Sequence, residues 1–182
     1  MTLGGVKPGQ TVLTLGTGGV SVFAVQFAKL LGARVVSTTS SEAKAAWLRE
    51  LGAEHVVLYT EDERWGRAIR KVTGGVDHVV EVGGAGTLTQ SLAATAPGGT
   101  ISLIGVVAGG QQPLSIFPVF MNQLRVQGVF VGHRRGFEAM CAAIETHSLR
   151  PVVDQTFDFD QAADAMQFMQ EARHRGKVVI RL

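Results

Sequence analysis

Apolar residues in the first part of the chain form short continuous runs that alternate with longer stretches of helical spacing. The run TVLTL at residues 11–15 is continuous, which is typical of a strand buried on both faces of a sheet. In the stretch behind it, apolar residues recur every three or four positions, which predicts one buried helix face. This face consists of Val20, Phe23, Ala24, Phe27, Ala28 and Leu31, and Gly32 is expected to end the helix.

The same alternation continues to about residue 106. Further strands are predicted at RVVST, HVVLY, DHVVEV and TISLIGV, and further helices at SSEAKAAWLREL, ERWGRAIRKV and GTLTQSLAATA. Strands that are separated by helices pair in parallel through right-handed crossovers. The sequence therefore predicts an α/β fold with a doubly wound parallel sheet, the Rossmann fold.

The pattern changes after Gly110. Residues 111–123 are expected to form a loop with a short helix, and RVQGVFV at residues 125–131 a sixth strand. Helices follow at about residues 135–146 and 160–173, together with the extended pieces RPVVDQTF and KVVIRL, which have no evident neighbour in the sheet. We therefore expect a Rossmann domain over residues 1–150 and a C-terminal helix with strands over residues 151–182.

Composition and charge exclude several classes of protein. One cysteine among 182 residues excludes a disulfide framework, and without a signal-peptide pattern at the N-terminus we expect a cytoplasmic protein. Residues 82–124 carry no charge, but glycines and prolines interrupt them throughout, so no membrane span is expected. The net charge of +2 is small, and nucleic-acid binding is not expected although the C-terminal third is locally basic.

The loop GTGGVS between the first strand and its helix is the first candidate site. The first N–H groups of a helix have no partner within it and attract a phosphate, and glycines let the phosphate approach. Such a loop is also common as an ordinary turn, but its place between strand and helix favours a dinucleotide. Ser21 stands where the third glycine is usual, and its hydroxyl is expected to bond nearby backbone. The candidate residues are Gly16, Thr17, Gly18, Gly19, Val20 and Ser21.

The end of the second strand decides which dinucleotide is expected. An NAD site places a carboxylate there, whereas this chain has Thr39, Ser40 and Ser41. Glu42 is explained by a capping box with Thr39 that starts the next helix. The hydroxyls, followed by Lys44, suit a 2′-phosphate, which predicts NADP(H) in preference to NAD(H); the alternative is that Lys44 is simply a solvated helix residue.

Three segments together carry a family resemblance. VKPGQTVLTLGTGGVSVFAVQFAKLLGA, VDHVVEVGGAGTLTQSLAATAPGGTISLIGV and the closing GKVVI resemble the medium-chain dehydrogenase/reductase superfamily, in particular its zinc-type alcohol dehydrogenase-like and quinone oxidoreductase-like members. The resemblance implies a backbone near the nicotinamide carboxamide at Ile104, Gly105 and Val106. It implies further cofactor-lining positions at Val82, Gly83, Val129 and Val131, and an adenosine-phosphate neighbour at Tyr59, the end of the third strand.

The resemblance also implies what these 182 residues lack. Members of the superfamily carry an N-terminal GroES-like catalytic domain, into which their C-terminal strands return, and these residues contain no such domain. In intact members a hydride passes between NADPH and a carbonyl, alcohol or enone, so we expect this chain to bind cofactor but to be inactive alone. Two alternatives are a non-enzymatic nucleotide-sensing or interaction module and, less favoured by the motifs, a Rossmann methyltransferase.

No side chain is a candidate for catalysis or for zinc. Cys141 shares a predicted helix face with Phe137, Met140 and Ile144 and is expected to be a core residue. The five histidines are scattered without ligand spacing. These observations predict no catalytic residue and no metal.

An apolar segment predicts self-association. Leu114, Ile116, Phe117, Val119 and Phe120 follow the fifth strand closely, and an apolar sheet edge favours pairing. In the family that the chain resembles, this region commonly forms a dimer contact. We therefore expect a two-fold homodimer through residues Leu114 to Phe120.

Overall fold

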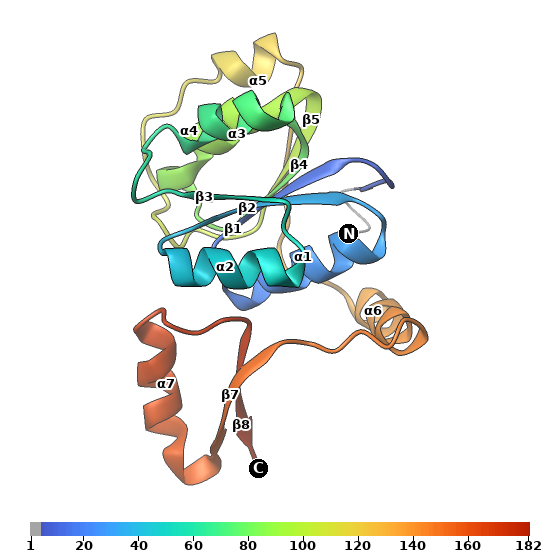
Figure 1. Ribbon diagram of the computed structural model, residues 1–182, viewed down its shortest axis with the longest axis vertical. Helices are drawn as coiled ribbons and strands as arrows, with labels where there is room; N and C mark the ends of the chain where they lie inside the picture. The colour runs from blue at the N-terminus through green and yellow to red at the C-terminus, as the bar shows by residue number, and fades with distance from the viewer. Residues whose placement is uncertain (1–4) are drawn as a thin grey trace.

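Six parallel strands form the main sheet of the protein, which the computed structural model describes over residues 5–182 (Figure 1). Residues 1–4 of the expected first domain lie outside the described residues. The strand order is β3-β2-β1-β4-β5-β6, and every neighbouring pair is parallel. The strands are β1 (Thr11–Leu15), β2 (Arg34–Thr39), β3 (His55–Leu58), β4 (Val76–Glu81), β5 (Thr95–Leu103) and β6 (Arg125–Gly128). The predicted doubly wound fold is confirmed.

Helices cover both faces of this sheet because successive strand residues point to opposite faces. Val12 and Val35 pack with α1 (Gly19–Leu30) and α2 (Glu42–Leu51), whereas their neighbours Leu13 and Val36 pack on the other face. That second face holds α3 (Trp65–Thr73) and α4 (Ala85–Ala94), and the short α5 (Phe117–Met121) lies near α4 (Figure 1). The strands are apolar on both faces for this reason.

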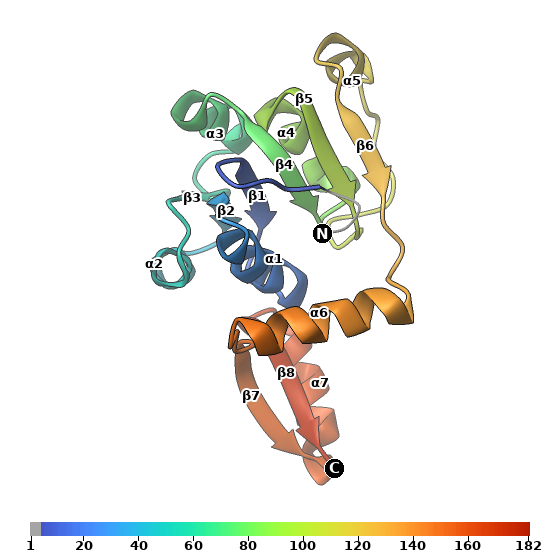
Figure 2. The same cartoon turned by 90° about the vertical axis from the view of Figure 1, so that its right-hand side faces the viewer.

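A second, two-stranded sheet stands apart from the first (Figure 2). It pairs β7 (Val153–Asp158) with β8 (Lys177–Arg181) in parallel, and the crossover between them contains a 3-10 turn (Phe159–Gln161) and α7 (Ala162–Gln170). The two extended pieces without a predicted neighbour are therefore neighbours of each other. The helix α6 (Arg134–Thr146) connects the two sheets, and within residues 5–182 no helix is both long and apolar enough to span a membrane.

Several predicted boundaries and faces were wrong. β3 ends at Leu58, so Tyr59 follows the strand, and β6 ends at Gly128, so Val129 and Val131 lie beyond it. In α1 the predicted face residues Phe27 and Ala28 are buried, but Val20 and Leu31 are exposed and Val22 and Val25 are buried instead. This helix contacts the sheet with a face turned from the one that the spacing indicated.

The expectation that Cys141 is a core residue was also wrong. Cys141 is only partly buried, α6 has no fully buried residue, and Phe137 on the same helix is exposed. The amphipathic pattern predicted a helix correctly but did not predict that the described residues would leave its apolar side largely open.

Candidate functional site

The glycine-rich loop forms an open turn at the carboxyl end of β1. Gly16 has φ +74°, a left-handed conformation that favours glycine, and its N–H donates to the Thr38 carbonyl at 2.7 Å. A Cβ added at Gly16 or Gly18 would meet nothing within 4 Å. The buried Ser21 donates its hydroxyl to the Leu15 carbonyl at 2.5 Å, so the expected bond to nearby backbone is confirmed. The serine at the third position thus links the start of α1 to the end of β1 and leaves the space beside Gly16 and Gly18 open.

The N-terminus of α1 is electrostatically prepared for an anion. Gly18 is the N-cap and no side chain caps the helix, and no acidic residue occupies the first turn. The first N–H groups of the helix therefore present partial positive charge at an open surface. The loop fits a pyrophosphate for these reasons.

A segment from the far end of the chain, which we call the strap (residues 172–177), crosses this loop. The Gly176 N–H donates to the Thr17 carbonyl at 2.9 Å, and the Thr17 hydroxyl donates to the His174 carbonyl at 3.4 Å. Gly18 and Gly176 pair as an isolated parallel bridge. The strap thereby becomes a wall of the site beside the glycine-rich loop.

Lys177, the last residue of the strap, was not among the predicted site residues. A Cβ added at Gly19 would lie 2.9 Å from its Cδ and Cε and 3.0 Å from its Nζ. Within residues 5–182 no carboxylate or carbonyl accepts a hydrogen bond from this ammonium group. A cation beside the positive end of a helix is unfavourable unless an anion lies between them. The sequence signal for Lys177 was the pair Gly176-Lys177 at the start of β8.

The predicted adenosine end lies at the carboxyl end of β2. Thr39 is buried within the strand, while Ser40 and Ser41 are partly exposed beyond it. The predicted capping box was wrong: the N-cap of α2 is Ser41, whose hydroxyl accepts the Lys44 N–H at 3.4 Å. Glu42 instead pairs with Arg49 at 2.5 Å, along the helix. Its carboxylate is therefore paired with a cation of its own helix.

Lys44 is held by the strap. Its ammonium donates to the Ala172 carbonyl at 2.7 Å. Burial lowers the pKa of Lys44 below its usual range, and the nearby Arg175 guanidinium lowers it further, whereas Asp154 acts in the opposite direction. Arg175 itself lies over the Trp47 ring, 5.7 Å from the centroid. Two cations, of which only Lys44 was predicted, thus lie close to each other beside α2.

The second half of the site consists mainly of backbone. Val82 and Gly83 follow β4, and Ile104, Gly105 and Val106 follow β5, on the neighbouring strand. The two segments are in close contact, since a Cβ added at Gly105 would lie 2.6 Å from the Val82 carbonyl oxygen. The structure therefore brings these five predicted residues together.

The remaining predicted residues lie around this edge. Val20 and Tyr59 are exposed, Tyr59 donating its N–H to the Thr39 carbonyl at 3.1 Å. Val129 donates its N–H to the Leu103 carbonyl at 2.9 Å, whereas Val131 is largely exposed. In the part of the chain that the structure describes, no three His, Cys, Asp or Glu side chains gather as a metal-binding group.

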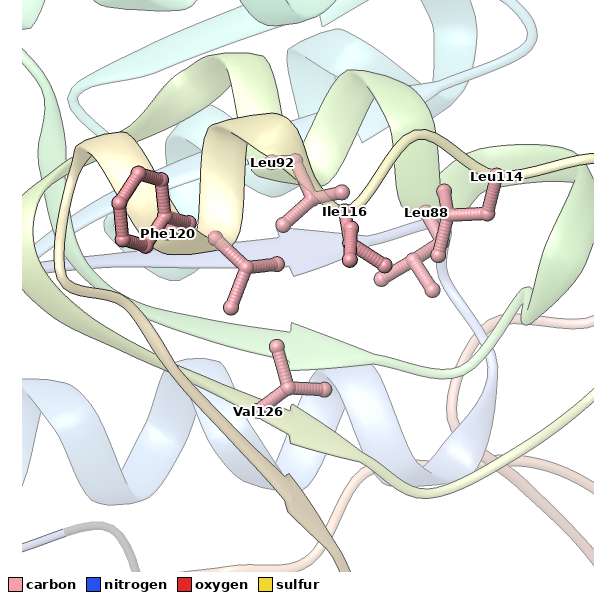
Figure 3. A pocket seen from close by; sticks show the side chains of 7 residues that line it. Leu88, Leu92, Leu114, Ile116, Phe120 and Val126 are labelled. Atoms are coloured by element: carbon pink, nitrogen blue, oxygen red, sulfur yellow. The ribbon is translucent and has the colours of Figure 1, made fainter.

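A separate apolar groove of about 330 Å³ lies beside the edge strand β6 (Figure 3). Its lining comes from α4, the segment around α5, and β6: Leu88, Leu92, Leu114, Ile116, Val119, Phe120 and Val126. Ile116 and Phe120 are 76% and 74% exposed. The groove belongs to the segment for which self-association was predicted and is formed almost entirely by aliphatic and aromatic side chains.

Comparisons with known proteins agree with this geometry. Residues 19–146 match the family model described as zinc-binding dehydrogenase. A zinc-type alcohol dehydrogenase-like protein of Schizosaccharomyces pombe is 45% identical over 183 residues, which cover 97% of this chain and 53% of that protein. The chain spans about half the length of the curated relatives it matches.

Solved structures give the same result. The crystal structure of an NAD-dependent alcohol dehydrogenase matches with a TM-score of 0.91 and 36% identity, over 100% of this chain and 53% of that one. The quinone oxidoreductase from Thermus thermophilus, whose structures include a complex with NADPH, matches with a TM-score of 0.83 and 31% identity, over 100% of this chain and 60% of that one.

Proposed function

Because the chain belongs to the zinc-binding dehydrogenases of the medium-chain dehydrogenase/reductase superfamily, as their dinucleotide-binding domain, we propose that it holds NADP(H) along the carboxyl edge of its sheet. The intact protein then transfers a hydride between NADPH and a carbonyl, alcohol or enone. When bound, NADPH would supply the hydride to a carbonyl or enone, and NADP+ would accept it from an alcohol. The residues of this chain bind and orient it, and the chain alone is expected to be inactive.

The observation that carries this proposal is the pairing of Lys177 with the open glycine-rich loop. The loop presents partial positive charge at the N-terminus of α1, and the Lys177 ammonium, which has no acceptor among residues 5–182, lies beside Gly19. A pyrophosphate between them removes the repulsion and satisfies both groups. Gly16, Thr17, Gly18, Gly19, Val20 and Ser21 are the loop residues assigned to it.

We assign the two ends of the dinucleotide by the chemistry of the two halves. Thr39, Ser40, Ser41, Lys44 and Tyr59 surround the adenosine ribose and its 2′-phosphate. The nicotinamide contacts the backbone of the segments after β4, β5 and β6, at Val82, Gly83, Ile104, Gly105, Val106, Val129 and Val131. The preference for NADP(H) rests on the hydroxyls, on Lys44 and Arg175, and on the turning of Glu42 toward Arg49.

Calorimetry on the wild type and on Lys44→Ala tests the assignment of the 2′-phosphate. Hydrogen bonds to charged groups contribute about 1.5–3 kcal/mol, so the variant is expected to bind NADPH about ten- to a hundredfold more weakly. Its affinity for NADH stays nearly unchanged, because NADH has no 2′-phosphate. The control is Lys71→Ala, an exposed lysine in the last turn of α3. A wild type that prefers NADH, or equal losses for both cofactors, contradicts the assignment.

The division of the chain and its assembly are also part of the proposal. We assign residues 1–150 to the cofactor domain and residues 151–182 to a unit that returns toward a catalytic domain, in a cytoplasmic protein. A homodimer forms through residues Leu114 to Phe120, because the apolar groove lies at the open sheet edge and Leu114, Ile116 and Phe120 in its lining are exposed. Light scattering that shows a monomeric wild type contradicts the dimer, and an Ile116→Asp variant that keeps a dimeric mass contradicts its interface.

A further inference from the structure

The carboxylate of Glu81, the last residue of β4, is completely buried and fully hydrogen-bonded. Its Oε1 accepts the N–H groups of Gly83 at 2.8 Å and Gly84 at 3.0 Å, and the Thr87 hydroxyl at 2.6 Å. Its Oε2 accepts the Ser91 hydroxyl. A buried carboxylate is costly unless such donors surround it, and here four of them do.

All four donors belong to the turn after β4 and to the helix α4 that follows. Gly84 has φ +80°, and a Cβ added there would lie 2.7 Å from the Gly109 carbonyl oxygen and 2.8 Å from the Val106 Cα. The turn therefore has one tightly packed conformation. The Glu81 carboxylate holds it from the inside, since it binds two consecutive N–H groups of the turn and two hydroxyls of the helix.

The turn in turn holds the segment that follows β5. The N–H of Ile104 donates to the Glu81 carbonyl at 2.8 Å, and the N–H of Ala108 donates to the Gly83 carbonyl at 2.7 Å. In the reverse direction, the Ala85 N–H donates to the Gly109 carbonyl at 2.9 Å. Residues 104–109 thus follow the conformation of residues 82–85, with little room for independent movement.

We propose that Glu81 is a positioning residue for the nicotinamide end of the dinucleotide. Its carboxylate fixes the turn after β4, and through the turn it fixes the backbone of residues 104–108. In a doubly wound sheet each half serves one nucleotide, and β4 and β5 belong to the half opposite the adenosine. Glu81 touches no reacting atom. This inference rests on the cofactor site proposed above.

Binding of a whole cofactor and of its adenosine part separates positioning from stability. The probes are NADPH and 2′,5′-ADP, which lacks the nicotinamide, and the variants are Glu81→Leu and the matched Asp77→Leu. Asp77 is also on β4, but its carboxylate accepts the Thr11 N–H at 2.8 Å, at the far end of the strand. Glu81→Leu is expected to weaken NADPH at least about tenfold and 2′,5′-ADP less than about threefold. Asp77→Leu should change the two affinities equally or not at all.

Two milder variants keep the inference testable if Glu81→Leu does not fold. Thr87→Val removes one donor and is expected to weaken NADPH about threefold without changing 2′,5′-ADP. Glu81→Gln should keep nearly wild-type affinities for NADPH and 2′,5′-ADP. The glutamine amide oxygen replaces Oε1, and its NH2 group donates to the Ser91 oxygen. Equal losses for both probes in Thr87→Val or Glu81→Leu overturn the inference. A wild type that binds neither probe overturns the proposed function instead.

Discussion

The first half of the sheet, β1 to β3, offers the proposed cofactor charged and hydroxyl side chains beside the backbone of the glycine-rich loop, whereas the second half, β4 to β6, offers it mainly backbone. Around the first half lie the hydroxyls of Ser40 and Ser41 and the cations Lys44 and Lys177. Around the second, glycines at positions 84 and 105 let two turns come into direct contact. Substitutions in the first half are therefore expected to change cofactor affinity with little loss in the free energy of unfolding. Substitutions in the second half are expected to lower the free energy of unfolding as well.

Gly84→Ala should produce the largest difference between the halves. The left-handed φ of Gly84 and the close Gly109 carbonyl oxygen both oppose a side chain, so the free energy of unfolding is expected to fall by about 3 kcal/mol. Gly18→Ala, in the first half, has open space and φ −70° and should cost less than about 1 kcal/mol. Urea denaturation followed by circular dichroism measures both. Similar losses would contradict the comparison.

Lys177→Ala should act on binding alone. Its ammonium is exposed and makes no ion pair with the described residues, so the free energy of unfolding should change by less than about 0.5 kcal/mol. NADPH and NADH share the pyrophosphate, and both are expected to bind about tenfold more weakly. Calorimetry with both cofactors is the measurement, and Lys29→Ala at the other end of α1 is the control. Loss for only one cofactor would refute a role at the pyrophosphate.

The smallest expected effect is on the pH dependence of the free energy of unfolding. It can be compared between the halves, because a buried pair of polar side chains joins neighbouring strands in each half. In the first half Thr14 and Ser37 share a hydrogen bond of 2.8 Å, and neither titrates near neutral pH. In the second half His78 Nε2 lies 3.0 Å from the Ser102 hydroxyl, and burial lowers the pKa of His78 below its usual 6.5. Between the lowered pKa and 6.5 the unfolded chain binds more protons than the folded chain.

The free energy of unfolding should therefore fall as the pH decreases from about 7 through this window, and the loss should level off below the lowered pKa. Urea denaturation at several pH values measures the slope. His78→Gln should flatten it, whereas Thr14→Ser should leave it unchanged. An unchanged slope in His78→Gln would assign the pH dependence to other groups.

The main sheet was predictable because its strands have a strong local signal. Val12 with Leu13, and Val35 with Val36, form continuous apolar pairs whose members serve opposite faces. The pairing of β7 with β8 has no such local signal, because 18 residues that include α7 separate the two strands. The capping box failed for a similar reason: Thr39 had the required spacing to Glu42, but it belongs to β2 and Ser41 begins the helix.

Sequence reasoning missed Lys177 and Glu81. Lys177 is far in sequence from the loop that it contacts, and Glu81 acts through the backbone turn that it holds. Lys177 reaches Gly19 from the opposite end of the chain, which periodicity does not report. Glu81 had a recognisable signal: it is the last charge before the uncharged residues 82–124, and Gly83, Gly84, Thr87 and Ser91 follow it at the spacing of a turn and a helix. A buried acid at the end of a strand indicates hydrogen-bond donors in the following turn and helix, because an unpaired buried carboxylate is costly.

The strap also sets the order in which the site is completed during synthesis. A ribosome makes the chain from its N-terminus, and domains generally fold in that order. Thr17 and His174, which are hydrogen-bonded, are 157 positions apart. The sheet and the glycine-rich loop are thus complete in the nascent chain long before Lys177 emerges. Full affinity for the proposed dinucleotide therefore requires synthesis to pass residue 177, so a nascent chain that ends within α7 carries a folded sheet without the Lys177 ammonium beside its glycine-rich loop.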